Sequence, residues 1–127
     1  MNIAIVGLGS NIDPENNIAK ARKILATEQV LLKESSFLRT SPIDRPEQNS
    51  FINGVCMVQT SLNQQQFEEW LKDIEKGLGR VRNQDKFAPR TIDLDIVVWN
   101  SRIVDRDLYT REFLKKAVLE VMPELPL

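Results

Sequence analysis

Histidine is absent from the 127-residue sequence, and cysteine occurs once, at Cys56. Without histidine the chain cannot carry out Ser-His-Asp or Cys-His catalysis, and it cannot bind zinc through imidazole. A single cysteine excludes an intrachain disulfide and a metal site built from several cysteines. Any enzyme chemistry must therefore use carboxylates, arginine, lysine, hydroxyl and backbone groups, together with hard metal ions.

The sequence also lacks an apolar run near the ~20 residues of a membrane span, and its N-terminus lacks the basic segment of a signal peptide. Basic and acidic residues number 17 and 18, for a formal net charge of -1, which gives no bulk attraction to nucleic acid or to an anionic membrane. Apolar residues make up 42%, as in globular proteins. We expect one cytoplasmic domain over residues 1–127, acting as a monomer without nucleic-acid or membrane partners.

Hydrophobic periodicity and turn residues predict four strands and three helices. Strands are expected at residues 3–8, 30–38, 51–60 and 91–99, and helices at 14–26 and 111–121. A further amphipathic helix is expected after Asn63, with its apolar pattern running from Phe67 to Leu78 and its end marked by Gly77 and Gly79. The expected helix N-caps are Asp13, Asn63 and Thr110, and Gln66 completes a capping box with Asn63. The order strand, helix, strand, strand, helix, strand predicts an α+β, ferredoxin-like βαββαβ core with a mainly antiparallel sheet and an additional C-terminal helix.

Two aspartates on the last predicted strand are the first candidate site. Ile92, Leu94, Ile96 and Val98 alternate as the apolar face, so Asp93 and Asp95 share the other face with Val97 and Trp99. Two neighbouring carboxylates on a half-buried strand are costly unless a cation neutralises them. Hard carboxylate oxygens suit Mg²⁺, although a pair of solvated surface aspartates is the simpler alternative.

Basic residues gather immediately before these aspartates. Arginine binds phosphate oxygens with a planar, bidentate fork, and metal-binding aspartates beside arginines are typical of phosphoryl transfer. The cluster therefore favours a polyphosphate site over a solvated run of surface charges. Its members are Lys76, Arg80, Arg82, Lys86 and Arg90.

Two weaker signals lie elsewhere in the chain. Gly7 and Gly9 do not complete a dinucleotide-binding or Walker A motif, so they indicate a tight turn, with backbone contact to a ligand possible at Gly9. Phe51 and Asn53 share one strand face, where a ring and an amide could hold a flat heterocycle. Packing of Phe51 in the core is the simpler interpretation, as it is for Cys56.

Several segments together resemble a known family. Arg-Val-Arg at residues 80–82 and Ala-Pro-Arg-Thr-Ile-Asp-Leu-Asp-Ile at 88–96 are similar to the signature of 6-hydroxymethyl-7,8-dihydropterin pyrophosphokinase, a folate-pathway enzyme. Gly-Ser-Asn at 9–11, Arg-Thr-Ser-Pro at 39–42 and Phe-Ile-Asn at 51–53 match in the same order. The resemblance covers residues 3–99 well and the tail poorly, and the chain ends earlier than most relatives.

The resemblance implies a transfer of diphosphate from ATP to the pterin hydroxymethyl group, with release of AMP and with two Mg²⁺ ions. It implies that Asp93 and Asp95 bind metal and that they act in catalysis with Arg80, Arg82 and Arg90. The implied pterin-binding residues are Thr40, Ser41, Pro42, Ile43, Phe51, Asn53 and Phe113. The implied ATP-binding residues are Glu75, Arg80, Arg82, Phe87, Arg90 and Arg111, with Phe87 and Ala88 standing where relatives usually carry tryptophan and glycine.

Two alternatives belong to other functional classes. A degenerate paralogue would bind pterin or nucleotide without turnover, because of the shortened tail. The segment between Val104 and Arg111 is also shorter than usual, and a His-Tyr pair of the family is missing. A ferredoxin-like RNA-binding module would need two or three exposed aromatics on adjacent central strands, and only Phe51 approaches that pattern.

Overall fold

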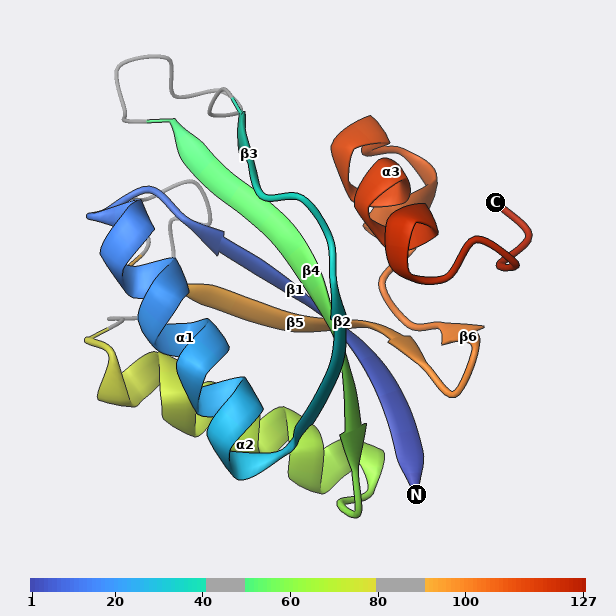
Figure 1. The fold of residues 1–127 in the computed structure, drawn as a ribbon, viewed down its shortest axis with the longest axis horizontal. Coiled ribbons are helices and arrows are strands. Elements are labelled where there is room, and N and C mark those ends of the chain that lie inside the picture. The colour runs from blue at the N-terminus through green and yellow to red at the C-terminus, as the bar shows by residue number, and fades with distance from the viewer. Residues whose placement is uncertain (41–49, 80–90) are drawn as a thin grey trace.

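The fold has one antiparallel sheet with helices on both faces, as Figure 1 shows for the computed structural model. The structure describes residues 1–40, 50–79 and 91–127. The strands are β1 (Asn2–Ser10), β2 (Val30–Glu34), β3 (Leu38–Thr40), β4 (Phe51–Thr60), β5 (Asp93–Trp99) and β6 (Arg102–Ile103). The helices are α1 (Pro14–Glu28), α2 (Gln64–Gly77), the 3₁₀ helix η1 (Arg106–Tyr109) and α3 (Glu112–Val121).

The sheet order is β2-β4-β1-β5-β6, with β3 also paired to β4, and every pairing is antiparallel. The β1-α1-β2 and β4-α2-β5 connections place α1 and α2 on one face of the sheet, and α3 covers the other face. This arrangement confirms the predicted α+β, ferredoxin-like core with an additional C-terminal helix.

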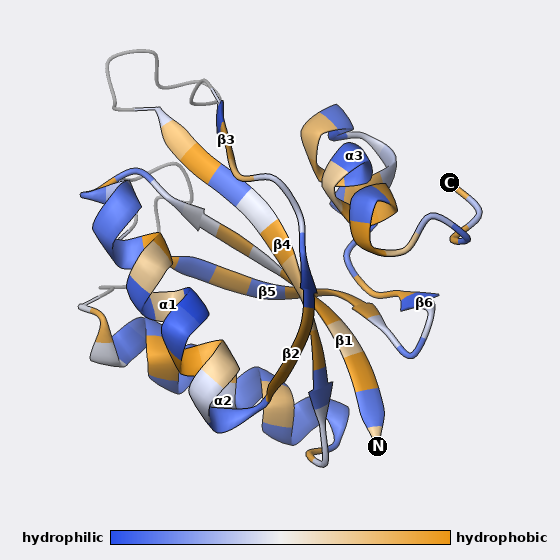
Figure 2. Cartoon of the chain, in the orientation of Figure 1, coloured by the Kyte–Doolittle hydropathy of each residue, from blue (hydrophilic) through white to orange (hydrophobic). Residues whose placement is uncertain are grey.

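Each face of the sheet buries its own hydrophobic cluster. The cluster under α1 and α2 includes Ile18, Leu25, Phe67, Leu71 and Leu94. The cluster under α3 includes Ile5, Val55, Val97, Leu114 and Val118. Figure 2 shows the corresponding alternation of hydrophobic and hydrophilic residues along α1 and α2. None of the helices within the described ranges is long and apolar enough to cross a membrane.

The prediction for α2 is confirmed in detail. The Asn63 side chain accepts from the Gln66 backbone N–H at 2.8 Å, and the Gln66 side chain accepts from the Asn63 N–H at 3.0 Å. This capping box satisfies two of the otherwise unpaired groups at the helix start. The helix ends at Gly77, and Gly79 has a φ of 94°, a conformation that glycine adopts without strain.

The predicted alternation along the last strand is wrong at its C-terminal end. The register with β1 shifts between Ile5 and Val6, so that Ile5 pairs with Val98 and Val6 pairs with Ile96. The β-bulge leaves Val97 as an extra residue, and it reverses which face the following side chains point to. Val98 therefore joins the α3 cluster, whereas Trp99 packs against Phe67 on the α2 side with ring centroids 5.7 Å apart.

Two predictions near the start of the chain need correction. The tight turn expected at Gly7 and Gly9 is strand, because β1 continues to Ser10. Asp13 stands at the N-cap position of α1, but its side chain makes no capping hydrogen bond.

Two further predictions need correction. The single strand expected at 30–38 is divided between β2 and β3. The interruption lies at Ser35, whose N–H donates to the Val55 carbonyl of β4 and whose hydroxyl oxygen accepts from the Val55 N–H. Thr110 does not cap α3: it ends η1, and Arg111 occupies the N-cap position of α3 without a side-chain capping bond.

Candidate functional site

Two glycines of β1 separate the predicted pterin residues from the two aspartates. Across the sheet, Gly9 pairs with Asn53 of β4 on one side and with Asp93 of β5 on the other. One pair further along, Gly7 lies between Val55 and Asp95 in the same way. Cross-strand partners project on the same face, so the strand between the amide and the carboxylates carries no side chain there. On the α3 face, neighbouring side chains lie over these glycines: a Cβ on Gly7 would lie 3.1 Å from Cγ2 of Val97, and one on Gly9 would lie 2.7 Å from Oδ1 of Asn53.

Asn53 is held in one orientation by its neighbours. Its Nδ2 donates to Oγ1 of Thr40 at 2.6 Å, and a Cβ placed on Gly9 would lie only 2.7 Å from its Oδ1. The same Cβ would lie 3.9 Å from Cδ1 of Phe51. The structure thus brings together Thr40, Phe51 and Asn53, as predicted, and a side chain in place of Gly9 would have to displace the Asn53 amide.

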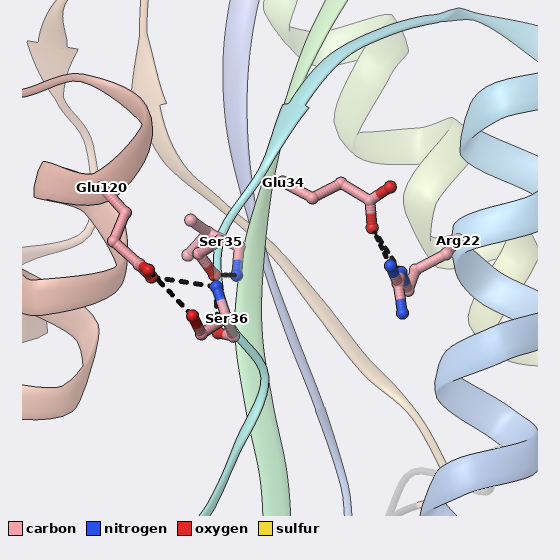
Figure 3. A network of polar contacts seen from close by, with 6 residues as sticks. Arg22, Glu34, Ser35, Ser36 and Glu120 are labelled. Carbon is pink, nitrogen blue, oxygen red and sulfur yellow. Dashed lines mark hydrogen bonds and ion pairs between the residues drawn. The ribbon is translucent and has the colours of Figure 1, made fainter.

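The segment that carries Thr40 is anchored to helices on both faces of the sheet. Ser36 donates its N–H and its hydroxyl to the Glu120 carboxylate of α3, each at 2.9 Å (Figure 3). On the opposite face, Glu34 forms an ion pair with Arg22 of α1 (Figure 3), and the Arg22 guanidinium lies 4.7 Å from the centroid of the Phe37 ring. These contacts fix the connection between β2 and β3, and thereby the start of β3.

Asp93 and Asp95 both project on the α3 face, as predicted from their spacing. Partial burial, and next the neighbouring Asp93 carboxylate, raise the pKa of Asp95 to about 6. The Lys72 ammonium, 3.4 Å from Oδ1 of Asp95, acts in the opposite direction. With the Asp95 side chain 49% exposed, this pair is an accessible concentration of negative charge, which fits a hard divalent cation.

Asp93 and Asp95 are the candidate metal ligands predicted from the sequence. Within residues 1–40, 50–79 and 91–127, the structure contains no cluster of three or more His, Cys, Asp or Glu side chains suited to a metal ion. A site here would therefore combine the two carboxylates with water and with oxygens of a bound substrate, the coordination that Mg²⁺ commonly adopts in phosphate-handling proteins.

Glu75 lies beneath β5 and is only 2% exposed. Its Oε2 accepts from the backbone N–H of Leu94 at 2.7 Å and lies 3.5 Å from Nζ of Lys72. The resemblance implied that Glu75 contacts ATP, and that contact remains a prediction. The structure gives this carboxylate a second partner, the strand that carries the aspartates.

Two residues of the C-terminal part were also predicted to line the site. Phe113 is partly buried and packs on the α3-face cluster, on the same side of the sheet as Asn53 and Asp95. Arg111 lies just before α3, and its Nη2 is 3.5 Å from Oδ2 of Asp107. Both remain predictions as ligand-binding residues.

Seven predicted site residues lie outside the described residues. They are Ser41, Pro42, Ile43, Arg80, Arg82, Phe87 and Arg90. Sequence reasoning missed two others that the structure joins to the site, Lys72 and Ser10. The i, i+3 spacing of Lys72 and Glu75 could have predicted their contact from the sequence. The Ser10 hydroxyl donates to the Thr91 carbonyl at 2.6 Å, and no local pattern predicts this bond because the two residues are far apart in the chain.

Comparisons with known proteins agree with these observations. A family model described as 7,8-dihydro-6-hydroxymethylpterin-pyrophosphokinase (HPPK) matches residues 5–123. The 2-amino-4-hydroxy-6-hydroxymethyldihydropteridine pyrophosphokinase of Bacillus subtilis is 32% identical over 135 residues, which cover 98% of this chain and 80% of that protein. The enzyme of the same name from Haemophilus influenzae is 29% identical, covering 98% and 84%. The folic acid synthesis protein FOL1 of Dictyostelium discoideum is 32% identical over 96% of this chain, but only 20% of that protein is covered.

Proposed function

Because this chain belongs to the 7,8-dihydro-6-hydroxymethylpterin-pyrophosphokinase family, we propose that it transfers diphosphate from ATP to 6-hydroxymethyl-7,8-dihydropterin in folate biosynthesis. In this reaction the pterin hydroxyl oxygen attacks the β-phosphorus of ATP and gives up its proton, the bond from the β-phosphorus to the oxygen bridging the α-phosphate breaks, and AMP leaves with that oxygen. Such chemistry depends mainly on positioning the two substrates and on neutralising phosphate charge.

The observation that carries the proposal is the placement of Asn53, Gly9 and Asp93 side by side on three neighbouring strands. An amide that can pair with a heterocycle and a carboxylate that can hold a cation are thus separated by one strand without a side chain. This spacing lets a pterin on β4 and a metal-bound triphosphate on β5 approach each other over Gly9.

On the pterin side, we assign binding to the Asn53 amide and to stacking on Phe51, with Phe113 of α3 as the second ring. The bond from Thr40 to Nδ2 of Asn53 supports this assignment, because it orients the amide before a ligand arrives. Residues Ser41, Pro42 and Ile43 complete the proposed pocket by resemblance.

On the nucleotide side, Asp93 and Asp95 would hold two Mg²⁺ ions, which neutralise triphosphate charge when bound. Burial, and next the Asp93 carboxylate, raise the pKa of Asp95, and a cation bound between the two carboxylates would offset both effects, which supports this assignment. The arginines Arg80, Arg82 and Arg90 would bind the transferred and leaving phosphates. Glu75, Phe87 and Arg111 are assigned to ATP by resemblance alone.

The decisive measurement is AMP production from ATP, with and without hydroxymethyldihydropterin, at millimolar Mg²⁺. We expect pterin-dependent AMP, and we expect Asp95→Ala to abolish it through loss of the metal. Unchanged turnover in Asp95→Ala would remove the proposed metal role. Calorimetry with pterin and a non-hydrolysable ATP analogue tests the degenerate alternative, which requires binding without AMP release.

The proposed site is drawn from a single chain, so we propose that the protein acts as a monomer. We also propose that the protein acts in the cytoplasm, because the proposed reaction depends on ATP and on a folate precursor. Light scattering coupled to size-exclusion chromatography tests the first statement: a dimer with residues of both subunits at the site would contradict it.

A further inference from the structure

The backbone of Leu94, between the two aspartates, is hydrogen-bonded by side chains of α2. Its N–H donates to Oε2 of Glu75 at 2.7 Å, and its carbonyl oxygen accepts from Nζ of Lys72 at 3.1 Å. Glu75 and Lys72 lie one helical turn apart, with Nζ and Oε2 separated by 3.5 Å. One helix therefore satisfies both polar groups of one strand residue.

Among the residues that the structure describes, no strand pairs with β5 on the far side of Leu94, and these two bonds take the place of such a pairing. In an antiparallel ladder, the N–H and C=O of one residue point to the same side, and those of the next residue point to the other side. Leu94 turns both groups away from β1, toward an edge that β6 does not reach, since β6 pairs only with Val98 and Trp99. A buried backbone group left without a partner is costly, and Glu75 with Lys72 removes that cost.

We propose that Glu75 is a positioning residue, which with Lys72 acts as a substitute strand and fixes the Asp93–Asp95 pair for a divalent cation. The inference rests on the proposed metal site. A rotation of either peptide group of Leu94 would redirect one aspartate relative to the other. The 2% exposed Glu75 carboxylate resists such a rotation, because the packed helix α2 holds it in place.

The mechanism predicts that the reach of the side chain at position 75 matters more than its charge. Glu75→Gln keeps an oxygen acceptor at the same distance and removes the charge. Glu75→Asp keeps the charge and withdraws the acceptor by one methylene. We expect Mn²⁺ affinity within about threefold of wild type for Glu75→Gln, and a loss of about tenfold or more for Glu75→Asp, the usual range for residues that support metal ligands.

Mn²⁺ binding to the full chain can be followed by the paramagnetic broadening of the Leu94 and Ile96 amide signals in NMR spectra, which needs no turnover. Val118→Ala, in the α3-face cluster, is the control for loss of stability: it should lower the melting temperature without changing Mn²⁺ affinity. If Glu75→Asp does not fold, Glu75→Gln alone decides, since a tenfold loss of affinity there would overturn the proposal.

The remaining outcomes are also decisive. If Mn²⁺ affinity is lost in Glu75→Gln but kept in Glu75→Asp, Glu75 acts through its charge. If the two variants bind Mn²⁺ equally well, Glu75 does not position the aspartates. Either result overturns the inference while leaving the metal site intact. If Asp95→Asn binds Mn²⁺ as wild type does, the metal site itself is wrong, and the inference falls with it.

Discussion

Asp95 connects the electrostatics of this fold to its proposed chemistry. Its pKa is raised to about 6, against an ordinary value of 3.8, by partial burial and by the Asp93 carboxylate. Because the folded-state pKa exceeds the unfolded one, ionisation of Asp95 disfavours the folded state at neutral pH. That penalty is present above pH 6 and is relieved as the pH falls toward 4.

A pH dependence of cation binding follows from this shift. Protonation of Asp95 removes a ligand charge, so we expect Mn²⁺ affinity to fall as the pH is lowered through about 6. Lys72→Met should move the midpoint upward, because the ammonium that lowers the Asp95 pKa is lost. Carbon-13 NMR of the Asp95 carboxyl checks both statements. A midpoint near 4 in the wild-type protein would contradict them.

Gly9 offers a second test at the scale of one residue. In Gly9→Ala the new methyl would lie 2.7 Å from Oδ1 of Asn53, so the amide must move and its bond to Thr40 is strained. We expect pterin affinity to fall at least tenfold and the free energy of unfolding to fall by about 1–3 kcal/mol, the usual cost of overpacking. Calorimetric titration with pterin and denaturant unfolding measure the two effects.

Gly77→Ala is the matched control. A Cβ at Gly77, in the last turn of α2, would meet nothing within 4 Å. Alanine is the better helix former, so this variant should be stabilised by up to about 1 kcal/mol and should bind pterin normally. Equal losses of pterin affinity in both variants would show that Gly9 has no special place beside Asn53.

Among the elements, α2 has the clearest sequence signal and also supports β5. Removing its cap in Asn63→Ala eliminates the bond to the Gln66 N–H, at a cost of about 0.5–2 kcal/mol in the free energy of unfolding. Because Glu75 lies three turns away, Mn²⁺ affinity should not change. Chemical denaturation and the NMR titration test this separation, and Gln65→Ala, beside the cap on the exposed face, serves as control.

The strand β5 illustrates how far sequence patterns reach within one element. The alternation of Ile92, Leu94 and Ile96 correctly predicted that Asp93 and Asp95 share a face. It failed beyond Val97, because a bulge depends on how β5 pairs with β1 and leaves no mark in a run of apolar residues. The split between β2 and β3 was missed for the same reason, since Ser35 is recruited by β4.

At the scale of the whole molecule, side chains of α1 and α3 bind the end of β2 and the β2–β3 connection from opposite faces of the sheet. Glu120→Ala removes both bonds to Ser36, and we expect it to lower the free energy of unfolding by about 1–3 kcal/mol. Glu124→Ala, an exposed carboxylate beyond the same helix, should change it by less than about 0.5 kcal/mol. Equal stabilities of the two variants in denaturant unfolding would show that the Glu120 contact contributes nothing.

The sequence by itself determined the order of elements, the cap of α2, the shared face of Asp93 and Asp95, and the family. These depend on local spacing, which is written along the chain as periods of two and 3.6 residues. Only the tertiary structure decided that Gly9 lies between Asn53 and Asp93, that Glu75 and Lys72 complete the edge of β5, and that Glu120 binds Ser36. Each of these contacts joins segments that lie far apart in the chain. Strand register and helix docking bring those segments together, and no local sequence pattern encodes either.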